Sequence, residues 1–106
     1  PVYLKLAIDT GATYTMLSNE SALSIGLNPS LRALREIEVT TGSGTIVAPV
    51  IKIPRFRALG YEIKNLEVVC HNLPPESSVE GLLGLNFLKH SNIHLQFIQN
   101  TIEITR

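Results

Sequence analysis

The tripeptide Asp9-Thr10-Gly11 is the part of this sequence best suited to acid–base chemistry. Asp9 is the only aspartate among 106 residues, and it directly follows the apolar run Leu4–Ile8. A carboxylate at the end of an apolar strand is poorly solvated, and a following glycine lets the backbone approach closely. The carboxyl of Asp9 could therefore act as one half of an acid–base pair. The same residue types are common turn formers, so the tripeptide alone also fits an ordinary turn.

A second carboxyl group would be needed to complete such a pair. Activating water against an amide and protonating the product requires two carboxyl groups that share a proton. The sequence contains eight glutamates, but none lies at a similar junction of apolar strand and glycine turn. A twofold-symmetric homodimer would place two copies of Asp9 face to face. We therefore expect this chemistry to require a second copy of the chain.

The elements that must position Asp9 are predominantly strands. Apolar residues alternate or form short runs in seven segments, as is typical of β-strands. These segments are residues 4–8, 13–17, 36–40, 46–53, 61–69, 93–97 and 101–105. Such closely spaced strand signals, combined with only two short helix signals, predict a mainly β barrel or sandwich.

Helices and turns are predicted between these strands. Ser18 or Asn19 can cap a short helix over residues 20–25 that ends before Gly26, and a second helix is expected over residues 86–90. Glycine, proline, asparagine and serine mark the turns and loops. We expect a turn at residues 28–30, hairpin turns at 42–44 and near 99–100, and a loop over 74–78. Pro49 predicts that its strand has a free edge at that point.

Two motifs together resemble the retropepsin-like aspartic proteases, which include the retroviral proteases and their cellular and bacterial relatives. The first motif is Asp9-Thr10-Gly11-Ala12 after an apolar strand. The second is Leu82-Leu83-Gly84-Leu85-Asn86-Phe87-Leu88, some seventy residues later. The resemblance covers about residues 4–104. It implies a retropepsin-like closed β-barrel, the half-fold of an acid protease, with one or two short helices.

The resemblance also assigns roles to individual residues. Asp9 would be the catalytic carboxylate, Thr10 would interlock with its symmetry mate, and Gly11 would complete the catalytic loop. In this family, two apolar residues and a glycine form the other half of a ψ-shaped structure around the aspartate. The residues expected to bind the substrate or support this structure are Ala12, Gly42, Ser43, Gly44, Leu82, Leu83 and Gly84.

Two further features of the family bear on this sequence. The segment Gly42-Ser43-Gly44 falls where the family places its flap, a β-hairpin that closes over the substrate, although it also fits a plain surface hairpin. Family members usually have another strand well ahead of the aspartate loop, whereas eight residues precede Asp9 here. We therefore expect the C-terminal hairpin, Ile93 to Ile104, to supply most of the dimer sheet.

Metal and thiol chemistry are poorly supported by the remaining residues. His71, His90 and His94 do not follow a metal-ligand spacing, so we expect no metal and no cofactor. Cys70 cannot form an internal disulfide as the only cysteine. Adjacent side chains on a strand point to opposite faces, so Cys70 and His71 are not expected to pair, and Cys70 is expected to be buried and inert.

Other binding chemistries are also weakly indicated. Nine basic residues balance nine acidic ones, which argues against binding to nucleic acid or to an acidic membrane surface. The basic cluster Arg55-Phe56-Arg57 is expected to be a solvated loop or edge. Ser43 lacks the Gly-x-Ser-x-Gly pattern of a nucleophilic serine, and the glycines beside it lack the lysine and helix of a phosphate-binding loop.

The chain length predicts a single domain over residues 1–106. Its apolar runs are far shorter than the roughly 20 residues that a membrane-spanning helix needs. No signal peptide is recognisable and no initiator Met is present. One expectation is a soluble domain excised from a longer or membrane-anchored protein, with no indication of compartment.

Together these observations predict an aspartic endopeptidase that acts on peptides or proteins as a homodimer. A catalytically silent protease-like module for peptide binding or dimerisation is the alternative, because a fold can outlast its activity. A third possibility is a latent monomer that lacks flanking segments needed for dimerisation.

Overall fold

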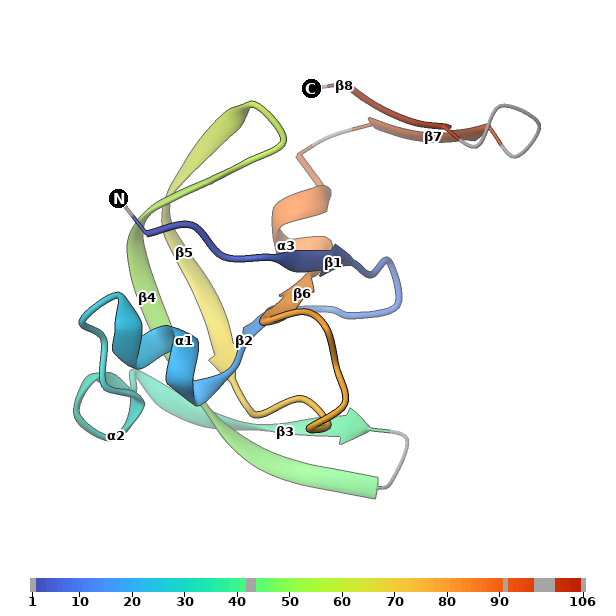
Figure 1. Ribbon diagram of the computed structural model, residues 1–106. Helices are drawn as coiled ribbons and strands as arrows, with labels where there is room; N and C mark the ends of the chain where they lie inside the picture. Colours follow the sequence, from blue (N-terminus) through green and yellow to red (C-terminus); the bar gives the residue numbers. More distant parts are fainter. Residues whose placement is uncertain (1, 42–43, 91, 97–100, 106) are drawn as a thin grey trace.

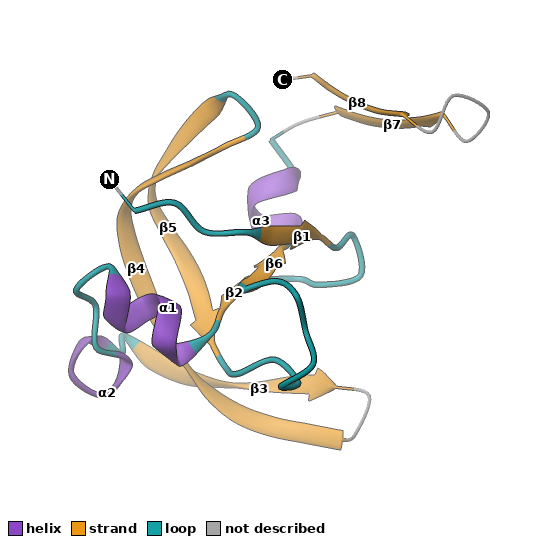
Figure 2. Cartoon of the chain, viewed as in Figure 1, coloured by secondary structure: helices purple, strands orange, loops and turns teal. Residues whose placement is uncertain are grey.

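The computed structural model describes residues 2–41, 44–90, 92–96 and 101–105 (Figure 1). Strands dominate these residues and the helices are short (Figure 2). The elements are β1 (Leu6–Ile8), β2 (Thr15–Leu17), α1 (Asn19–Ser24), α2 (Pro29–Arg32), β3 (Arg35–Thr41), β4 (Gly44–Ala58), β5 (Tyr61–Cys70), β6 (Gly81–Leu83), α3 (Leu85–Leu88), β7 (Asn92–Gln96) and β8 (Thr101–Thr105). The predicted mainly β architecture is confirmed.

A curled six-stranded sheet forms the body of the molecule, with the strand order β1-β6-β2-β5-β4-β3. β6 lies between β1, to which it runs parallel, and β2, to which it runs antiparallel. β2 in turn runs parallel to β5. The edge strands β1 and β3 are not paired with each other in the described residues, so the sheet is half of a barrel rather than a closed one.

β4 is the longest strand and joins two neighbours in succession. Its residues 44–50 pair with β3, and its residues 50–58 pair with β5. Pro49 precedes the β5 ladder by one residue, so the predicted free edge exists on that side. The predicted strand end at residue 53 is wrong, because β4 continues to Ala58. Pro54 has no N–H to donate, and the ladder skips it opposite Asn65, which has a φ of 58°.

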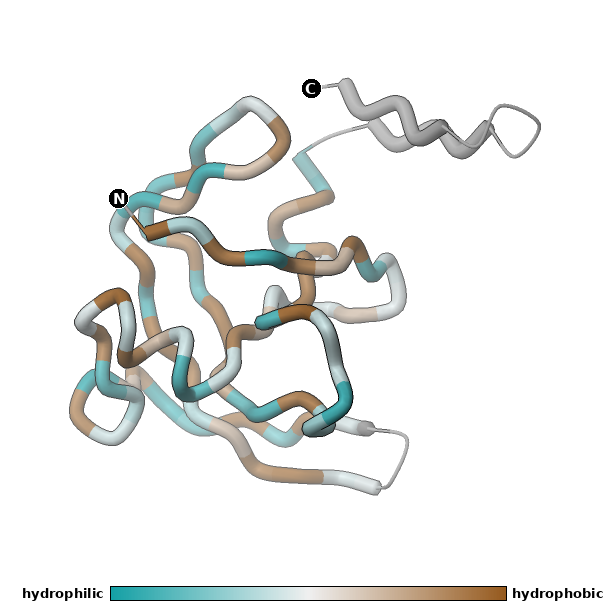
Figure 3. Tube along the Cα trace, in the orientation of Figure 1, coloured by the Kyte–Doolittle hydropathy of each residue, from teal (hydrophilic) through white to brown (hydrophobic). Residues whose placement is uncertain are grey.

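The continuation of β4 includes the basic cluster that was expected in a loop or at an edge. This part of β4 has a neighbour only on the β5 side, so it is an edge segment. Phe56 is buried, whereas Arg55 and Arg57 are exposed and lie 3.4 and 3.9 Å from Oε1 of Glu62. The alternation of hydrophobic and hydrophilic residues along β4 and β5 in Figure 3 follows this pattern.

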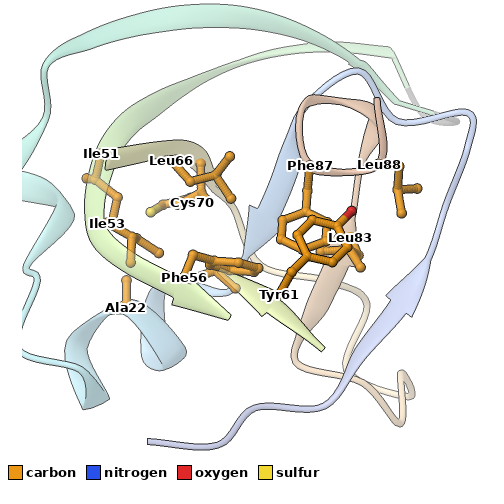
Figure 4. Packing of buried hydrophobic residues seen from close by; sticks show 12 residues of the cluster. Ala22, Ile51, Ile53, Phe56, Tyr61, Leu66, Cys70, Leu83, Phe87 and Leu88 are labelled. Carbon is orange, nitrogen blue, oxygen red and sulfur yellow. The ribbon is translucent and has the colours of Figure 1, made fainter. Parts of the chain in front are cut away.

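The main core lies between β4, β5 and α3 (Figure 4). The ring of Phe87 stacks on Tyr61 at a centroid distance of 4.9 Å and meets Phe56 at 5.5 Å. Ala48, Val50 and Val69 form a second buried cluster. Both clusters use β4 and β5, so these two strands form the platform that supports the rest of the fold.

The helices differ in part from the expectations. Ser18 caps α1 as predicted, with its Oγ accepting a hydrogen bond from the N–H of Ser21 at 3.1 Å. The turn predicted at residues 28–30 is instead the start of a third helix, α2. Asn28 is its N-cap and Pro29 occupies its first turn, where a missing N–H costs nothing.

The C-terminal hairpin is present as predicted, because β7 and β8 pair antiparallel. Its predicted turn near residues 99–100 lies outside the described residues. The two strands form a separate sheet, which projects from the end of α3 away from the main sheet in Figure 1.

Candidate active site

Asp9 lies immediately after β1, in a loop held by short hydrogen bonds. Its backbone N–H donates to the carbonyl of Leu83 at 3.0 Å, and its carbonyl accepts from the N–H of Ala12 at 3.2 Å. The N–H of Gly11 donates to Oδ1 of Asp9 at 2.9 Å. A Cβ at Gly11 would lie 3.2 Å from the same oxygen. The carboxylate is therefore oriented by the backbone of its own loop, which is crowded at Gly11.

The far side of the loop is held by α3. The N–H of Leu85 donates to the carbonyl of Ala12 at 2.8 Å, and that of Asn86 donates to the carbonyl of Thr13 at 3.1 Å. The two sequence motifs therefore meet in the structure, as the resemblance implied. Asp9 is half-buried in the single chain, while Thr10 and Gly11 are exposed.

A buried hydrogen-bond network fixes β2 against α3, and the sequence did not reveal it. Oδ1 of Asn86 accepts from the backbone N–H of Thr15 at 2.7 Å and from its hydroxyl at 2.8 Å. Nδ2 of Asn86 donates to the carbonyl of Glu67 at 2.6 Å, and the N–H of Gly84 donates to Oγ1 of Thr15 at 3.1 Å. Thr15 and Asn86 are 71 residues apart, so no local spacing signals their pairing.

Gly84 occupies a position that leaves no room for a side chain. A Cβ there would lie 2.5 Å from the backbone carbon and oxygen of Tyr14. This close approach brings Gly84 of the second motif directly against the backbone of Tyr14, between the aspartate loop and β2. Glycine is therefore required at this position by the packing of backbone on backbone.

A groove of about 1020 Å³ opens beside Asp9. Its boundaries are the aspartate loop, β3, the start of β4 and the segment after β5. Apolar residues supply much of its wall, including Met16, Ile37, Val39, Ile46 and Leu82. Glu38, His71 and Asn72 are polar members of the lining. Asn72 is anchored by accepting the N–H of Asn19 at 3.0 Å.

The residues expected to bind the substrate occupy different environments. Ala12 and Leu82 line the groove. Leu83 is 3% exposed and lies in the main core, and Gly84 is buried against the backbone of Tyr14, so both support the aspartate loop from below. Gly44 is exposed at the start of β4 with a φ of 128°. Gly42 and Ser43 lie outside the described residues.

Cys70 is a free cysteine and is buried, as expected from the sequence. Burial raises the pKa of the Cys70 thiol to about 11, because desolvation disfavours the thiolate. His71 is in the groove lining. No group of three metal-ligating side chains occurs in the part of the chain that the structure describes. Within the same residues, no helix is long and apolar enough to cross a membrane.

A half-barrel with an aspartate loop closed by a β-strand and a short helix defines the aspartic protease-like half-fold. A sequence model described as "gag-polyprotein putative aspartyl protease" matches residues 2–90. The chain therefore belongs to this family of retropepsin-like aspartic proteases. A search of curated proteins found no match.

Two solved structures share the fold. One is a retropepsin-like aspartic protease from Rickettsia conorii, with a TM-score of 0.67 and 21% identity over 98% of this chain and 73% of that chain. The other is the retroviral protease-like domain of Ddi1 from Leishmania major. Its TM-score is 0.59, with 22% identity over 97% of this chain and 79% of that chain. The retropepsin-like fold predicted from the two motifs is thus confirmed.

Proposed function

We propose that this protein is an aspartic endopeptidase in which two copies of Asp9, one from each chain of a homodimer, activate water. The observation that carries the proposal is the position of the Asp9 loop beside the groove, with the carboxylate oriented by the N–H of Gly11. A carboxylate fixed at the edge of a peptide-sized groove is placed to act on a bound peptide bond.

The chemistry needs one protonated and one ionised carboxyl. Two carboxyls about 3 Å apart cannot both ionise readily, so they share a proton. The ionised member takes a proton from water as the water attacks the scissile carbonyl, and the protonated member donates to the carbonyl oxygen. The carboxyl that took the proton from water then gives it to the amide nitrogen, and the other carboxyl takes a proton back from a hydroxyl of the tetrahedral intermediate. The intermediate collapses to release the amine and the new carboxyl group, with no covalent enzyme intermediate. Activity is expected to favour acidic pH, where one proton is retained on the pair.

A second chain would supply the other carboxyl. Asp9 is the only aspartate in the sequence, and the neighbouring Thr10 and Gly11 are exposed in the single chain. Thr10 would interlock with its symmetry mate across the twofold axis. Within the described residues, the β7–β8 hairpin forms a separate two-stranded sheet. This hairpin would contribute the dimer sheet, because an isolated two-stranded hairpin is marginally stable.

The substrate would be an extended peptide with apolar side chains. The groove walls contributed by Met16, Val39 and Leu82 suit apolar side chains at alternate positions of a bound strand. The β3–β4 hairpin would close over the peptide and exclude water, as the flap does in this family.

Peptide cleavage by the unchanged protein and by Asp9→Asn tests the proposal. The substitution keeps the size of the side chain and removes its ionisation, so cleavage should fall by at least about a thousandfold. Glu76→Gln, in an exposed loop, is the matched control and should cleave normally. Cleavage by Asp9→Asn at the rate of the unchanged protein would show that Asp9 is not the catalyst.

The dimer is tested separately by mixing. When equal amounts of unchanged and Asp9→Asn chains exchange partners, only about a quarter of the dimers keep two Asp9 residues. Activity should fall to that fraction rather than to one half. Sedimentation over a concentration series should show self-association. Self-association without cleavage, and without thermal stabilisation by a statine-containing peptide, would favour the silent binding module.

A further inference from the structure

Tyr14 stands between two cavities. Its half-buried side chain packs against the second core cluster of Ala48, Val50 and Val69. It lines the groove beside Asp9, and it also lines a second cavity of about 500 Å³ bounded by β5 and α3. Among the residues that the structure describes, Thr13 is the only other one common to both linings. The position of the Tyr14 ring therefore sets where the groove ends and the second cavity begins.

Arg35 holds Tyr14 from outside both cavities. It is the first residue of β3, and its Nη2 donates to the hydroxyl of Tyr14 at 3.5 Å and to Oε1 of Glu67 at 2.6 Å. Glu67 lies on β5, and its carbonyl accepts from Nδ2 of Asn86, which binds Thr15. Through Glu67, Arg35 is connected to the same network that fixes the catalytic loop.

We propose that Arg35 is a positioning residue that fixes the Tyr14 ring at the boundary between the two cavities and so determines which substrate side chains the groove admits there. The proposal rests on the proposed function, because it assumes that a peptide occupies the groove. Arg35 lines neither cavity, so its effect on the peptide would pass through Tyr14.

Glu67 has a second cationic neighbour besides Arg35. Lys52 lies directly opposite Glu67 in the β4–β5 ladder and also lowers the pKa of its carboxyl. Glu67 therefore keeps a neighbouring cation when Arg35 is replaced. The Tyr14 hydroxyl, in contrast, loses the guanidinium that lies against it. Replacement of Arg35 should thus affect the position of Tyr14 more than the charge balance around Glu67.

The experiment is a double-mutant cycle with Arg35→Met and Tyr14→Phe, using peptides that carry Ala or Phe at each position in turn. The discrimination at a position is the ratio of KM for the Ala peptide to KM for the Phe peptide. Each single variant should change this KM ratio about fivefold, and both should do so at the same peptide position, with kcat nearly unchanged. A fivefold change is the size expected for the loss of one hydrogen bond. The double variant should change it no further, because both substitutions remove the same contact.

Arg57→Met is the matched control, since Arg57 is exposed and lies 3.9 Å from its nearest carboxylate oxygen, on Glu62. It should leave the ratio unchanged. An unchanged ratio in Arg35→Met, or additive effects in the double variant, would overturn the role of Arg35.

Failure of the proposed function gives a different result. If the unchanged protein binds statine-containing peptides but cleaves nothing, the catalytic proposal falls. The same cycle, read as Kd for statine peptides carrying Ala or Phe, then decides the role of Arg35. If the unchanged protein neither cleaves nor binds them, both proposals fall.

Discussion

The three strands around Asp9 and the three outer strands are stabilised in different ways. β1, β2 and β6, here called the centre, have three residues each, whereas β3, β4 and β5, the outer sheet, have seven, fifteen and ten. The centre depends on single contacts, such as the amide of Asn86 on Thr15 and the backbone contact at Gly84. The outer sheet depends on long ladders and on repeated apolar side chains.

This contrast indicates how each region tolerates change. In the outer sheet many apolar side chains pack into the same core. The loss of a methyl group from one of them therefore removes only a small fraction of the stabilising contacts. In the centre, by contrast, the contacts at Asn86 and Gly84 each depend on a single residue. We therefore expect similarly small substitutions to be much more costly in the centre.

Gly84→Ala should have the largest effect. The added methyl would lie 2.5 Å from the backbone of Tyr14, which cannot move away as the end of a flexible side chain could. The free energy of unfolding, measured with urea, should fall by more than about 3 kcal/mol, or the chain should fail to fold.

Gly60→Ala is the control in the outer sheet, at the β4–β5 turn. Gly60 has a φ of 84° with open space around a Cβ, so the cost is limited to backbone strain of about 1 kcal/mol. Equal losses for the two alanine variants would show that backbone crowding at Gly84 is not the limiting factor.

Asn86→Ala should have an intermediate effect. It removes two hydrogen bonds accepted from Thr15 and one donated to Glu67, and it leaves the hydroxyl of fully buried Thr15 with one partner fewer. The free energy of unfolding should fall by about 2 kcal/mol.

Ile51→Val, at a fully buried position of β4, is the control in the outer sheet. It should lower the free energy of unfolding by about 1 kcal/mol. A greater loss for Ile51→Val would reverse the comparison.

The ion pair between Arg35 of β3 and Glu67 of β5, within the outer sheet, should have the smallest effect, and this effect should depend on pH. The hydrogen bond from Arg35 holds the pKa of Glu67 below its ordinary value of 4.5. As the pH is lowered, Glu67 therefore binds a proton in the unfolded chain before it does so in the folded chain. The stabilisation from the ion pair is present above pH 4.5 and is lost as the pH falls through the pKa of Glu67 in the folded chain. Both side chains are more than a third exposed, so solvent screens the pair.

The contribution of the ion pair to stability is measured by comparing the urea midpoints of the unchanged protein and Glu67→Gln. The difference between them should be largest above pH 4.5 and should shrink as the pH falls. A difference that stays constant with pH would mean that the ionisation of Glu67 does not contribute.

The outer sheet was the easier region to predict from the sequence. Alternation along residues 36–40 and 61–69 is a repeating signal, and both strands are present. The end of β4 was mislocated at residue 53, because a proline inside a strand normally argues against continuation. The positive φ of Asn65 opposite Pro54 allows the strand to continue, and a backbone angle of this kind leaves no pattern in the sequence.

In the centre, β1 and β2 were expected from the apolar segments 4–8 and 13–17, whereas the aspartate loop and β6 were predicted by motif. The tripeptide at Asp9 and the glycine at Gly84 could be found because they belong to a recognisable pair of motifs. The Thr15–Asn86 bond could not, because it joins two common polar residues 71 positions apart. Nor could the shared contact of Arg35 with Tyr14 and Glu67, since three strands must first be placed in register.

The insertion of β6 between β1 and β2 also affects the order in which parts of the molecule can fold during synthesis. The N–H of Glu80 donates to the carbonyl of Lys5 at 2.7 Å, across 75 positions of the sequence, and such long-range pairings form slowly. A nascent chain that has left the ribosome only as far as Ser78 contains the whole outer sheet, yet it lacks the strand that closes the aspartate loop. The aspartate loop is therefore completed only after β6 and α3 have been synthesised.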